Sequence, residues 1–341
     1  MPGTVGSVLG RVGLACSIAT ALYATLLGVL LTPSAQRFAI YAHKVNTLFL
    51  GDDLNDPEEF GFAKHQVTPF NLDTPDGETL YAWHILPLDV YTRNEKSIRE
   101  ETRQSGPIRD FVETNAFRLL TSNQPEPARV VVNFHGNAGH VAQGWRTDTY
   151  RNLATQPNTH VLTIDYRGFG HSTGSPTEAG LITDGIALVD WILNVASIPP
   201  ERIVILGQSL GTAVSSAVAL HFADPKNELI PIESRESKPV VAQEAALQST
   251  LFAGIILVAP FSSLPSLLLT YRIGGLLPIL LPLRPFPSLA GVLTAQVADT
   301  WLSAERLSAY YRSLLGSKLL TSESGTGSMG SLQLLHSATI A

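Results

Sequence analysis

The chain has 341 residues, 45% of them hydrophobic, which is enough to bury the core of one large domain. Its formal net charge of −6 provides no basic surface for a phosphate backbone, which argues against nucleic acid as a partner. A single cysteine, Cys16, excludes both an intramolecular disulfide and a cysteine-based metal site.

The N-terminal segment, residues 1–36, carries a long apolar stretch. No charged residue occurs between Arg11 and Arg37, and residues 12–32 are almost all apolar or small. The stretch has the ~20 residues that span a bilayer and exceeds the ~7–15 apolar residues of a cleaved signal peptide, which is the alternative. We therefore expect a single-pass signal anchor in an endomembrane. The basic residues on its two sides balance, so neither orientation is favoured.

A connector and a hairpin follow the anchor. Residues 37–65 have the composition of a juxtamembrane connector with a short helix and an acidic loop. Strand-like runs at 66–72 and 79–86 flank Thr74-Pro75-Asp76-Gly77, and Pro-Asp-Gly between two such runs is typical of a turn. We expect this hairpin to open a single large domain, residues 66–341.

Two stretches interrupt the strand pattern of that domain. Residues 92–127 mix basic and acidic residues with few β-branched ones, which is typical of a solvated helix or a mobile insertion. Residues 225–250 mix charge and proline in the same way. We expect both to be surface insertions, and a docking site for a partner is the alternative for the first.

Largely apolar runs mark the remaining strands. They lie at 129–134, 160–164, 203–206, 254–258 and 331–336. Helical patterns separate most of these runs, and such alternation is typical of a mostly parallel sheet with helices on both faces. Active sites of such sheets gather beyond the carboxyl ends of the strands. We expect Gly139, Gly170, Ser209 and Pro260 along that edge.

A helix start is predicted after the strand at 160–164. Ser175 has the place of an N-cap, Pro176 that of the first helical residue, and Glu178 would close a capping box. An apolar face follows at helical spacing, made of Ile182, Ile186, Val189 and Leu193.

A GxSxG motif, Gly207-Gln208-Ser209-Leu210-Gly211, follows the run at 203–206 directly. In this place the motif predicts a nucleophile elbow, a sharp strand-to-helix turn with Ser209 at its tip. The flanking glycines are needed because a side chain at either position would collide with the tightly turned backbone. Residues 212–222 are rich in Ala, Val and Leu, as expected of a helix buried against a sheet. We expect Ser209 to be the nucleophile.

A serine hydroxyl needs a histidine base, a group that orients the base, and amides that hold the oxyanion. The candidate oxyanion donors are two backbone N–H groups. One belongs to Leu210, the residue after the nucleophile, and the other to Asn137 in the His-Gly turn after the strand at 129–134.

Residues 262–301 are the least sheet-like part of the second half. Within them, residues 276–283 place six large aliphatic side chains between prolines, too few to span a bilayer and too interrupted for one long helix. One interpretation is a connector packed on the core. The other is a cap over the active site whose apolar face accepts acyl chains or touches the membrane.

Three motifs carry a resemblance to a known family: HGNAG at 135–139, DYRGFGHSTG at 165–174 and GQSLG at 207–211. Behind an N-terminal anchor, they resemble the membrane-anchored branch of the α/β-hydrolase superfamily that includes lysophospholipase and monoacylglycerol lipase relatives. The resemblance covers about residues 66–315 and implies the α/β-hydrolase fold. It also implies cleavage of lipid or other apolar carboxylic esters through an acyl-enzyme on Ser209, with the membrane as partner and without metal or organic cofactor.

In the family the acid and the histidine follow the nucleophile in the chain, and neither is found at its expected place. No Asp or Glu occurs after Glu323, and His336 is the one histidine beyond His221. We therefore expect an incomplete triad in a chain truncated before its last strand and closing helix. A catalytically impaired, hydrolase-like protein is the alternative function. His336 at its strand end and the loop residues His140 and His171 are the candidates for the base, and for each the alternative is an ordinary strand-end or loop residue.

The resemblance also implies roles for two polar residues near the elbow. His135 is expected to stabilise its turn rather than to act as the base, and Asp165 is expected to be structural.

Overall fold

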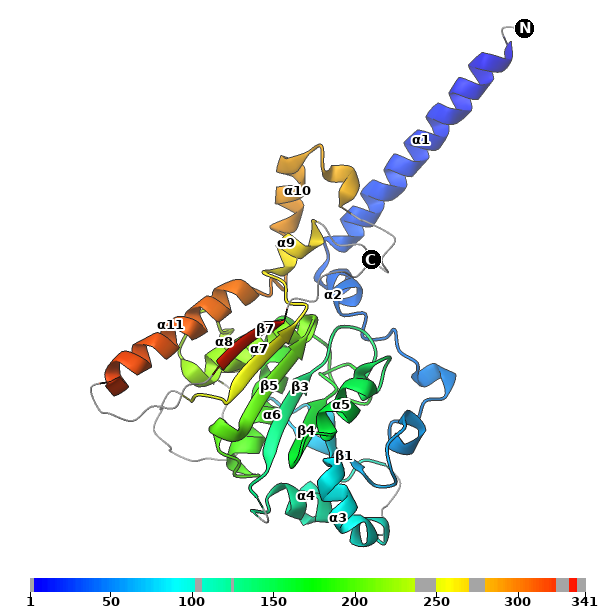
Figure 1. Cartoon of the computed structure of the whole chain (residues 1–341). Coiled ribbons are helices and arrows are strands. Elements are labelled where there is room, and N and C mark those ends of the chain that lie inside the picture. The colour runs from blue at the N-terminus through cyan, green and yellow to red at the C-terminus, as the bar shows by residue number, and fades with distance from the viewer. Residues whose placement is uncertain are drawn as a thin grey trace. The chain divides into compact units, whose positions relative to one another are not determined.

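The computed structural model describes residues 3–101, 106–123, 126–236, 250–269, 280–322 and 331–335 (Figure 1). The chain divides into two compact units. The first, here called the helical unit, comprises Met1–Ile40 and Pro265–Thr300. The second, the sheet unit, comprises Tyr41–Leu264 and Trp301–Ala341.

A seven-stranded sheet with the order β1-β2-β4-β3-β5-β6-β7 forms the sheet unit (Figure 1). β1 is antiparallel to β2 and β2 to β4, whereas the other neighbours are parallel. The strands are β1 (Val67–Asp73), β2 (Thr79–Ile85), β3 (Arg129–Phe134), β4 (Thr159–Ile164), β5 (Ile203–Gln208), β6 (Gly254–Val258) and β7 (Ser331–Leu335). The predicted strands and the mostly parallel sheet are therefore confirmed.

Eleven α-helices lie among the residues that the structure describes. They are α1 (Gly3–Leu30), α2 (Pro33–Tyr41), α3 (Leu88–Arg99), α4 (Asn115–Leu120), α5 (Arg146–Ala154), α6 (Glu178–Asn194), α7 (Leu210–Ala223), α8 (Ile232–Glu236), α9 (Leu264–Leu268), α10 (Pro287–Thr294) and α11 (Ser303–Ser322). Short 3₁₀ turns are η1 (Leu48–Leu50), η2 (Pro57–Phe60), η3 (Phe111–Glu113), η4 (Pro200–Arg202) and η5 (Leu281–Leu283).

Helices cover both faces of the sheet, as β2 shows. Successive side chains of a strand point to opposite faces. Trp83 joins a buried cluster with Tyr150 of α5. Its neighbour His84 packs edge-on against Phe111, which in turn contacts Trp191 of α6. One face therefore packs on α5 and the other on α6.

The connector contributes to the core rather than only linking two parts. Leu54 is fully buried, and its carbonyl oxygen accepts hydrogen bonds from the Tyr81 hydroxyl at 2.6 Å and from Trp83 Nε1 at 3.2 Å. The acidic loop therefore packs on one face of the β1–β2 hairpin.

The first insertion is more than the expected surface excursion. Ile108 exchanges backbone hydrogen bonds with β1, receiving one from Asn71 and donating one to Pro69. Phe111 is buried and stacks on Phe70, with ring centroids 4.4 Å apart. The many charged residues of this insertion hide its apolar residues when composition alone is considered. Ile108 and Phe111 attach the insertion, which contains α3 and α4, to the sheet.

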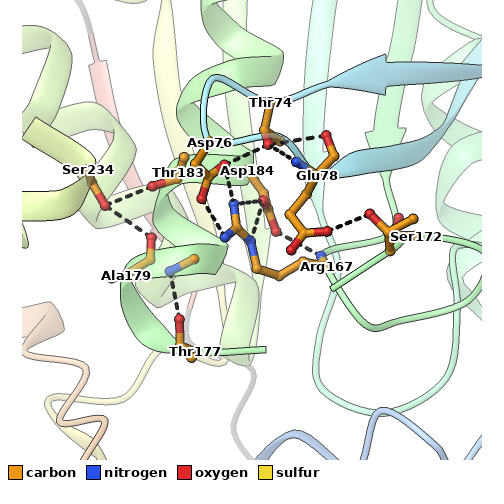
Figure 2. A network of polar contacts seen from close by, with 12 residues as sticks. Thr74, Asp76, Glu78, Arg167, Ser172, Thr177, Ala179, Thr183, Asp184 and Ser234 are labelled. Atoms are coloured by element: carbon orange, nitrogen blue, oxygen red, sulfur yellow. Dashed lines mark hydrogen bonds and ion pairs between the residues drawn. The ribbon is translucent and has the colours of Figure 1, made fainter. Parts of the chain in front are cut away.

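Within the second insertion, α8 is held to α6. The buried Ser234 hydroxyl donates to the carbonyl of Ala179 and lies 3.0 Å from the hydroxyl of Thr183 (Figure 2). Residues 237–249 of this predicted insertion lie outside the described residues, as do residues 270–279 of the predicted cap.

The predicted N-cap of α6 is wrong by two residues. Thr177, not Ser175, caps the helix, and its hydroxyl accepts a 2.9 Å hydrogen bond from the Gly180 N–H (Figure 2). Glu178 does not close a capping box on Ser175, because its carboxylate accepts from the Trp301 N–H at 3.0 Å and pairs with Arg306 at 2.7 Å.

The helical unit contains the predicted apolar helix. In α1, residues Gly10–Leu30 have a mean hydropathy of 1.9 and none of this stretch is buried, so the helix is long and apolar enough to cross a membrane. α2 follows it, and Gln36 of α2 bonds to residues 296 and 298 of the same unit.

Candidate active site

Ser209 lies at the turn between β5 and α7, as the GxSxG motif predicts. Its backbone has φ 49° and ψ −116°, a conformation with positive φ that a non-glycine residue rarely adopts. The Ser209 N–H donates a 2.9 Å hydrogen bond to the carbonyl of Val258 in β6, which fastens the turn to the sheet. Such strain persists only where the surrounding structure holds it, as at functional turns.

The two glycines of the motif are required by close packing. A Cβ at Gly207 would collide with the carbonyl oxygen of Gly211 and the hydroxyl of Ser215. A Cβ at Gly211 would collide with the carbonyl oxygen of Phe134 at the end of β3. The helix that begins at Leu210 can approach β3 this closely because both positions lack a side chain.

The His-Gly turn after β3 lies directly against the serine. Phe134 pairs with Gly207 and Gln208 with Val258, so β3, β5 and β6 end at one level. A Cβ at Gly136 would lie 3.5 Å from Ser209 Cβ. The structure therefore brings the turn at 135–139 and the elbow together at the carboxyl edge of the sheet.

Arg146, at the start of α5, binds this turn from one side. Its guanidinium donates hydrogen bonds to four backbone carbonyl oxygens within residues 136–140. They belong to Gly136 at 3.0 Å, Asn137 at 2.9 Å, Ala138 at 2.8 Å and His140 at 2.5 Å. The fork of guanidinium donors suits such a set of acceptors, whereas a lysine ammonium is a single point charge.

The Arg146 bonds set the direction of the turn's amides. In a planar trans peptide the C=O of one residue and the N–H of the next point in opposite directions. Because the Gly136 carbonyl points to Arg146, the Asn137 N–H points away from it. The N–H groups of Ala138 and Gly139 donate to the carbonyls of Tyr41 and Val45. The Ala138 and Gly139 amides therefore hold the turn to the segment around Tyr41 and Val45, and Asn137 stays the predicted donor of this turn.

The second predicted donor, the Leu210 N–H, belongs to the first residue of α7. The first N–H groups of a helix have no carbonyl four residues back within the helix to bond. The helix N-terminus also carries a partial positive charge that favours an anion. This amide therefore suits an oxyanion that forms on a group attached to Ser209.

His135 lies inside the turn and is fully buried. Its Nδ1 donates to the Gly136 carbonyl at 2.7 Å, and its Nε2 lies 3.7 Å from Asp165 Oδ1. Burial holds the pKa of His135 well below its usual value, so the ring is neutral. These contacts suit a residue that supports the turn.

Asp165, at the end of β4, is also fully buried. Its Oδ1 accepts from the Val141 N–H at 2.6 Å. Burial raises the pKa of Asp165 to about 7. Its contacts hold the segment after the His-Gly turn, which suits a structural carboxyl.

The two loop histidines contact groups other than Ser209. The buried His140 has Nε2 3.0 Å from the Thr47 hydroxyl, and its Nδ1 accepts from the Ala142 N–H at 3.3 Å, so both ring nitrogens are engaged. His171 is exposed and packs edge-on against Tyr81. His336, the remaining candidate from the sequence, lies outside the described residues.

An ion-pair network fixes the turn after β4 (Figure 2). The Arg167 guanidinium contacts Asp184 of α6 at 2.7 Å and Asp76 of the β1–β2 turn at 2.7 Å. The Arg167 N–H also donates to Asp184 at 2.8 Å. Sequence reasoning missed this network, and it missed Arg146. The sequence does contain a signal that could have identified Arg146, because this arginine begins the helix that follows the His-Gly turn.

A model of the alpha/beta hydrolase family matches residues 130–330, which is more than half of the chain. The chain belongs to the α/β-hydrolase family. Protein bem46 of Schizosaccharomyces pombe is 36% identical over 122 residues, which are 36% of this chain and 40% of that protein. The lysophosphatidylserine lipase ABHD12 of Danio rerio is 29% identical over 192 residues, 56% of this chain and 44% of that protein.

These matches span less than half the length of either relative. Among solved structures, an α/β hydrolase from Vibrio vulnificus aligns with a TM-score of 0.45 at 13% identity, covering 88% of this chain and 82% of that one. The family match and the mostly parallel sheet confirm the α/β-hydrolase fold expected from the three sequence motifs.

Proposed function

We propose that this α/β hydrolase is a membrane-anchored serine hydrolase that cleaves carboxylic esters of lipids through an acyl-enzyme on Ser209. The observation that carries the proposal is the elbow itself. Ser209 has a strained backbone and lies against Gly136, and Arg146 orients the peptide that carries the Asn137 N–H. The apolar helix α1 supports the anchoring.

The geometry supports two parts of the proposed reaction, the nucleophile and the oxyanion donors. The Ser209 hydroxyl oxygen attacks the ester carbonyl carbon, and its proton passes to a base. The tetrahedral oxyanion accepts hydrogen bonds from the N–H groups of Leu210 and Asn137. The C–O bond to the alcohol breaks and the alcohol takes up a proton. Water then hydrolyses the acyl-enzyme to release the fatty acid and free Ser209.

The substrate class is proposed from the relatives. Several of them, from fish, rat, mouse and frog, are lysophosphatidylserine lipases. We propose lysophospholipids, which carry one acyl ester on a glycerol backbone, as the substrates of this chain.

A second candidate function is a hydrolase-like protein with little or no turnover. It is favoured by the contacts of His135 and His140, whose ring nitrogens face the turn, Asp165 and the connector rather than the nucleophile. Loss of the base in a serine hydrolase leaves only the contributions of the oxyanion hole and of binding.

A fluorophosphonate probe separates the two candidate functions, because it reacts with a serine that is activated as a nucleophile. The full chain in detergent would be labelled and the modified peptide identified by mass spectrometry. The proposal predicts an adduct on Ser209 that is lost in Ser209→Ala and kept in Ser215→Ala, a buried serine of α7. No adduct on Ser209 in the folded chain would overturn the proposal and favour the second candidate. An adduct without hydrolysis of lysophosphatidylserine would refute the proposed substrate class alone.

A further inference from the structure

An exposed apolar surface lies on the helical unit around α10. Phe286, Leu289 and Val292 are 60%, 48% and 61% exposed. Phe286 is the N-cap of α10, and the spacing of three residues places Leu289 and Val292 on one face of the helix. Leu281 of η5 is also exposed, at 46%. We call these four residues the α10 patch.

Hydrogen bonds tie the end of α10 to α2. Gln36 donates from Nε2 to the carbonyl of Gln296 at 2.9 Å and accepts at Oε1 from the Ala298 N–H at 2.9 Å. Arg37 pairs with Asp299 at 3.3 Å. Gln36 is buried, so these bonds form an internal joint of the helical unit rather than a surface contact.

This joint lies close to the end of the candidate membrane helix. α1 ends at Leu30, and α2 begins at Pro33 and contains both Gln36 and Arg37. Because one turn of helix rises only about 5.4 Å, the joint lies within a short distance of the end of the apolar span. The α10 patch is therefore held near the end of α1 that would lie at the edge of the hydrocarbon core of a bilayer.

The charges of the segment suit a lipid surface. No acidic residue occurs from residue 265 to residue 298, and the two charged residues in that range are Arg272 and Arg284. Arg284 follows η5 directly and is exposed. Basic residues beside exposed apolar ones are typical of segments that lie in the interface, where they meet lipid phosphates.

We propose that the α10 patch inserts into the membrane–water interface beside α1, with bilayer lipid as its occupant. A protein with large exposed apolar side chains normally covers them, and the joint to α2 makes the bilayer the nearest apolar phase. The α10 segment then forms a second contact with the same membrane. The inference rests on the proposed anchoring by α1 and is independent of hydrolysis at Ser209.

Site-specific fluorescence tests the proposal on the full chain in vesicles of phosphatidylcholine with a minor fraction of phosphatidylserine. Cys16 of α1 is the one cysteine of the sequence and is exposed. A label can therefore be attached within the candidate span without any substitution. In a Cys16→Ser background, Leu289→Cys and Val292→Cys place an environment-sensitive label on the patch. Gly291→Cys is the matched control, because a Cβ there meets nothing within 4 Å and points to another side of the same helix.

Two quenchers distinguish the surroundings of each label. Lipids with a nitroxide near the head of the acyl chain quench labels in the interface, and aqueous iodide quenches labels in water. We expect severalfold stronger lipid quenching at positions 289 and 292 than at 291, and the reverse order for iodide.

Iodide quenching at all three positions would overturn the proposal, because the patch would then face water. Protection of 289 and 292 from both quenchers would also overturn it, because protein, such as a second copy, would then cover the patch. The label on Cys16 separates the two membrane contacts. Protection of Cys16 from iodide, together with iodide quenching at 289 and 292, would refute the α10 contact alone. Iodide quenching at Cys16 would refute the anchor on which the inference rests.

Discussion

Arg146 donates a 3.0 Å hydrogen bond to the carbonyl of Gly136, whose peptide plane carries the Asn137 N–H on its opposite side. The orientation of this predicted oxyanion donor thus depends on a guanidinium at the start of α5. Arg146 is in this sense a positioning residue for the proposed reaction.

Arg146→Lys is expected to slow fluorophosphonate labelling of Ser209 by about 10²-fold, which is the usual effect of losing one oxyanion donor. The ammonium of lysine cannot bond four carbonyls at once. Arg151→Lys is the matched control on the same helix, because Arg151 pairs with Asp148 and with the carbonyl of Phe60 rather than with the turn. The labelling rate is measured on variants whose thermal unfolding matches that of the wild type. Equal rates in Arg146→Lys and the wild type would refute the positioning role.

Gly211→Ala is expected to destabilise the fold by about 3 kcal/mol or more, because the new methyl group would overlap the Phe134 carbonyl oxygen and force α7 away from β3. Gly291→Ala is the control in α10, where a Cβ meets open space, and is expected to stabilise by about 0.4–1 kcal/mol. Denaturant unfolding in detergent measures both. A Gly211→Ala variant as stable as the wild type would show that the elbow is packed differently.

A buried histidine pair between β2 and β4 predicts acid sensitivity. His84 Nε2 lies 2.9 Å from His160 Nδ1, and burial lowers the pKa of His160 to about 3. An unfolded histidine titrates near pH 6.5, so between these values the unfolded chain binds the extra proton. This histidine therefore reduces the free energy of unfolding by about 1.4 kcal/mol for each pH unit below 6.5.

His160→Gln removes that titration and is expected to flatten the pH dependence between pH 6.5 and pH 4 relative to the wild type. Parallel pH profiles of wild type and His160→Gln would mean that His160 does not titrate differently in the folded chain.

Asp184→Asn is expected to destabilise the fold by about 3–5 kcal/mol, because it leaves a buried arginine short of one of its two carboxylates. Asp184 is fully buried, whereas Asp148 of α5 pairs with Arg151 at the surface. Asp148→Asn is therefore expected to cost no more than about 1 kcal/mol. A similar loss in both variants would show that the Arg167 network does not hold the β1–β2 turn to α6.

Much of this fold could be predicted because its strands carry local signals. The β-branched runs gave β3 and β6 their bounds, and the Pro-Asp-Gly turn placed the β1–β2 hairpin. The elbow could also be predicted, since a strand, two glycines and an apolar helix are adjacent in the sequence.

The rest depended on contacts between distant segments. Ser175 and Thr177 both have hydroxyls that can cap a helix. Thr177 is the N-cap of α6 in the structure, next to Glu178, whose carboxylate is bound by the Trp301 N–H and by Arg306. His140 is engaged by Thr47 of the connector, far away in the chain. No local pattern reports such partners, and the same holds for the carbonyls that Arg146 binds.

The most direct test of the proposed chemistry is to trap the acyl-enzyme. The full chain would be mixed with vesicles containing lysophosphatidylserine, quenched in acid and digested, and the peptide that contains Ser209 analysed by mass spectrometry. We predict the fatty acyl group of the added lipid on Ser209, with none in Ser209→Ala. A peptide that remains unmodified at every time point, together with no release of fatty acid, would contradict a serine hydrolase acting through Ser209.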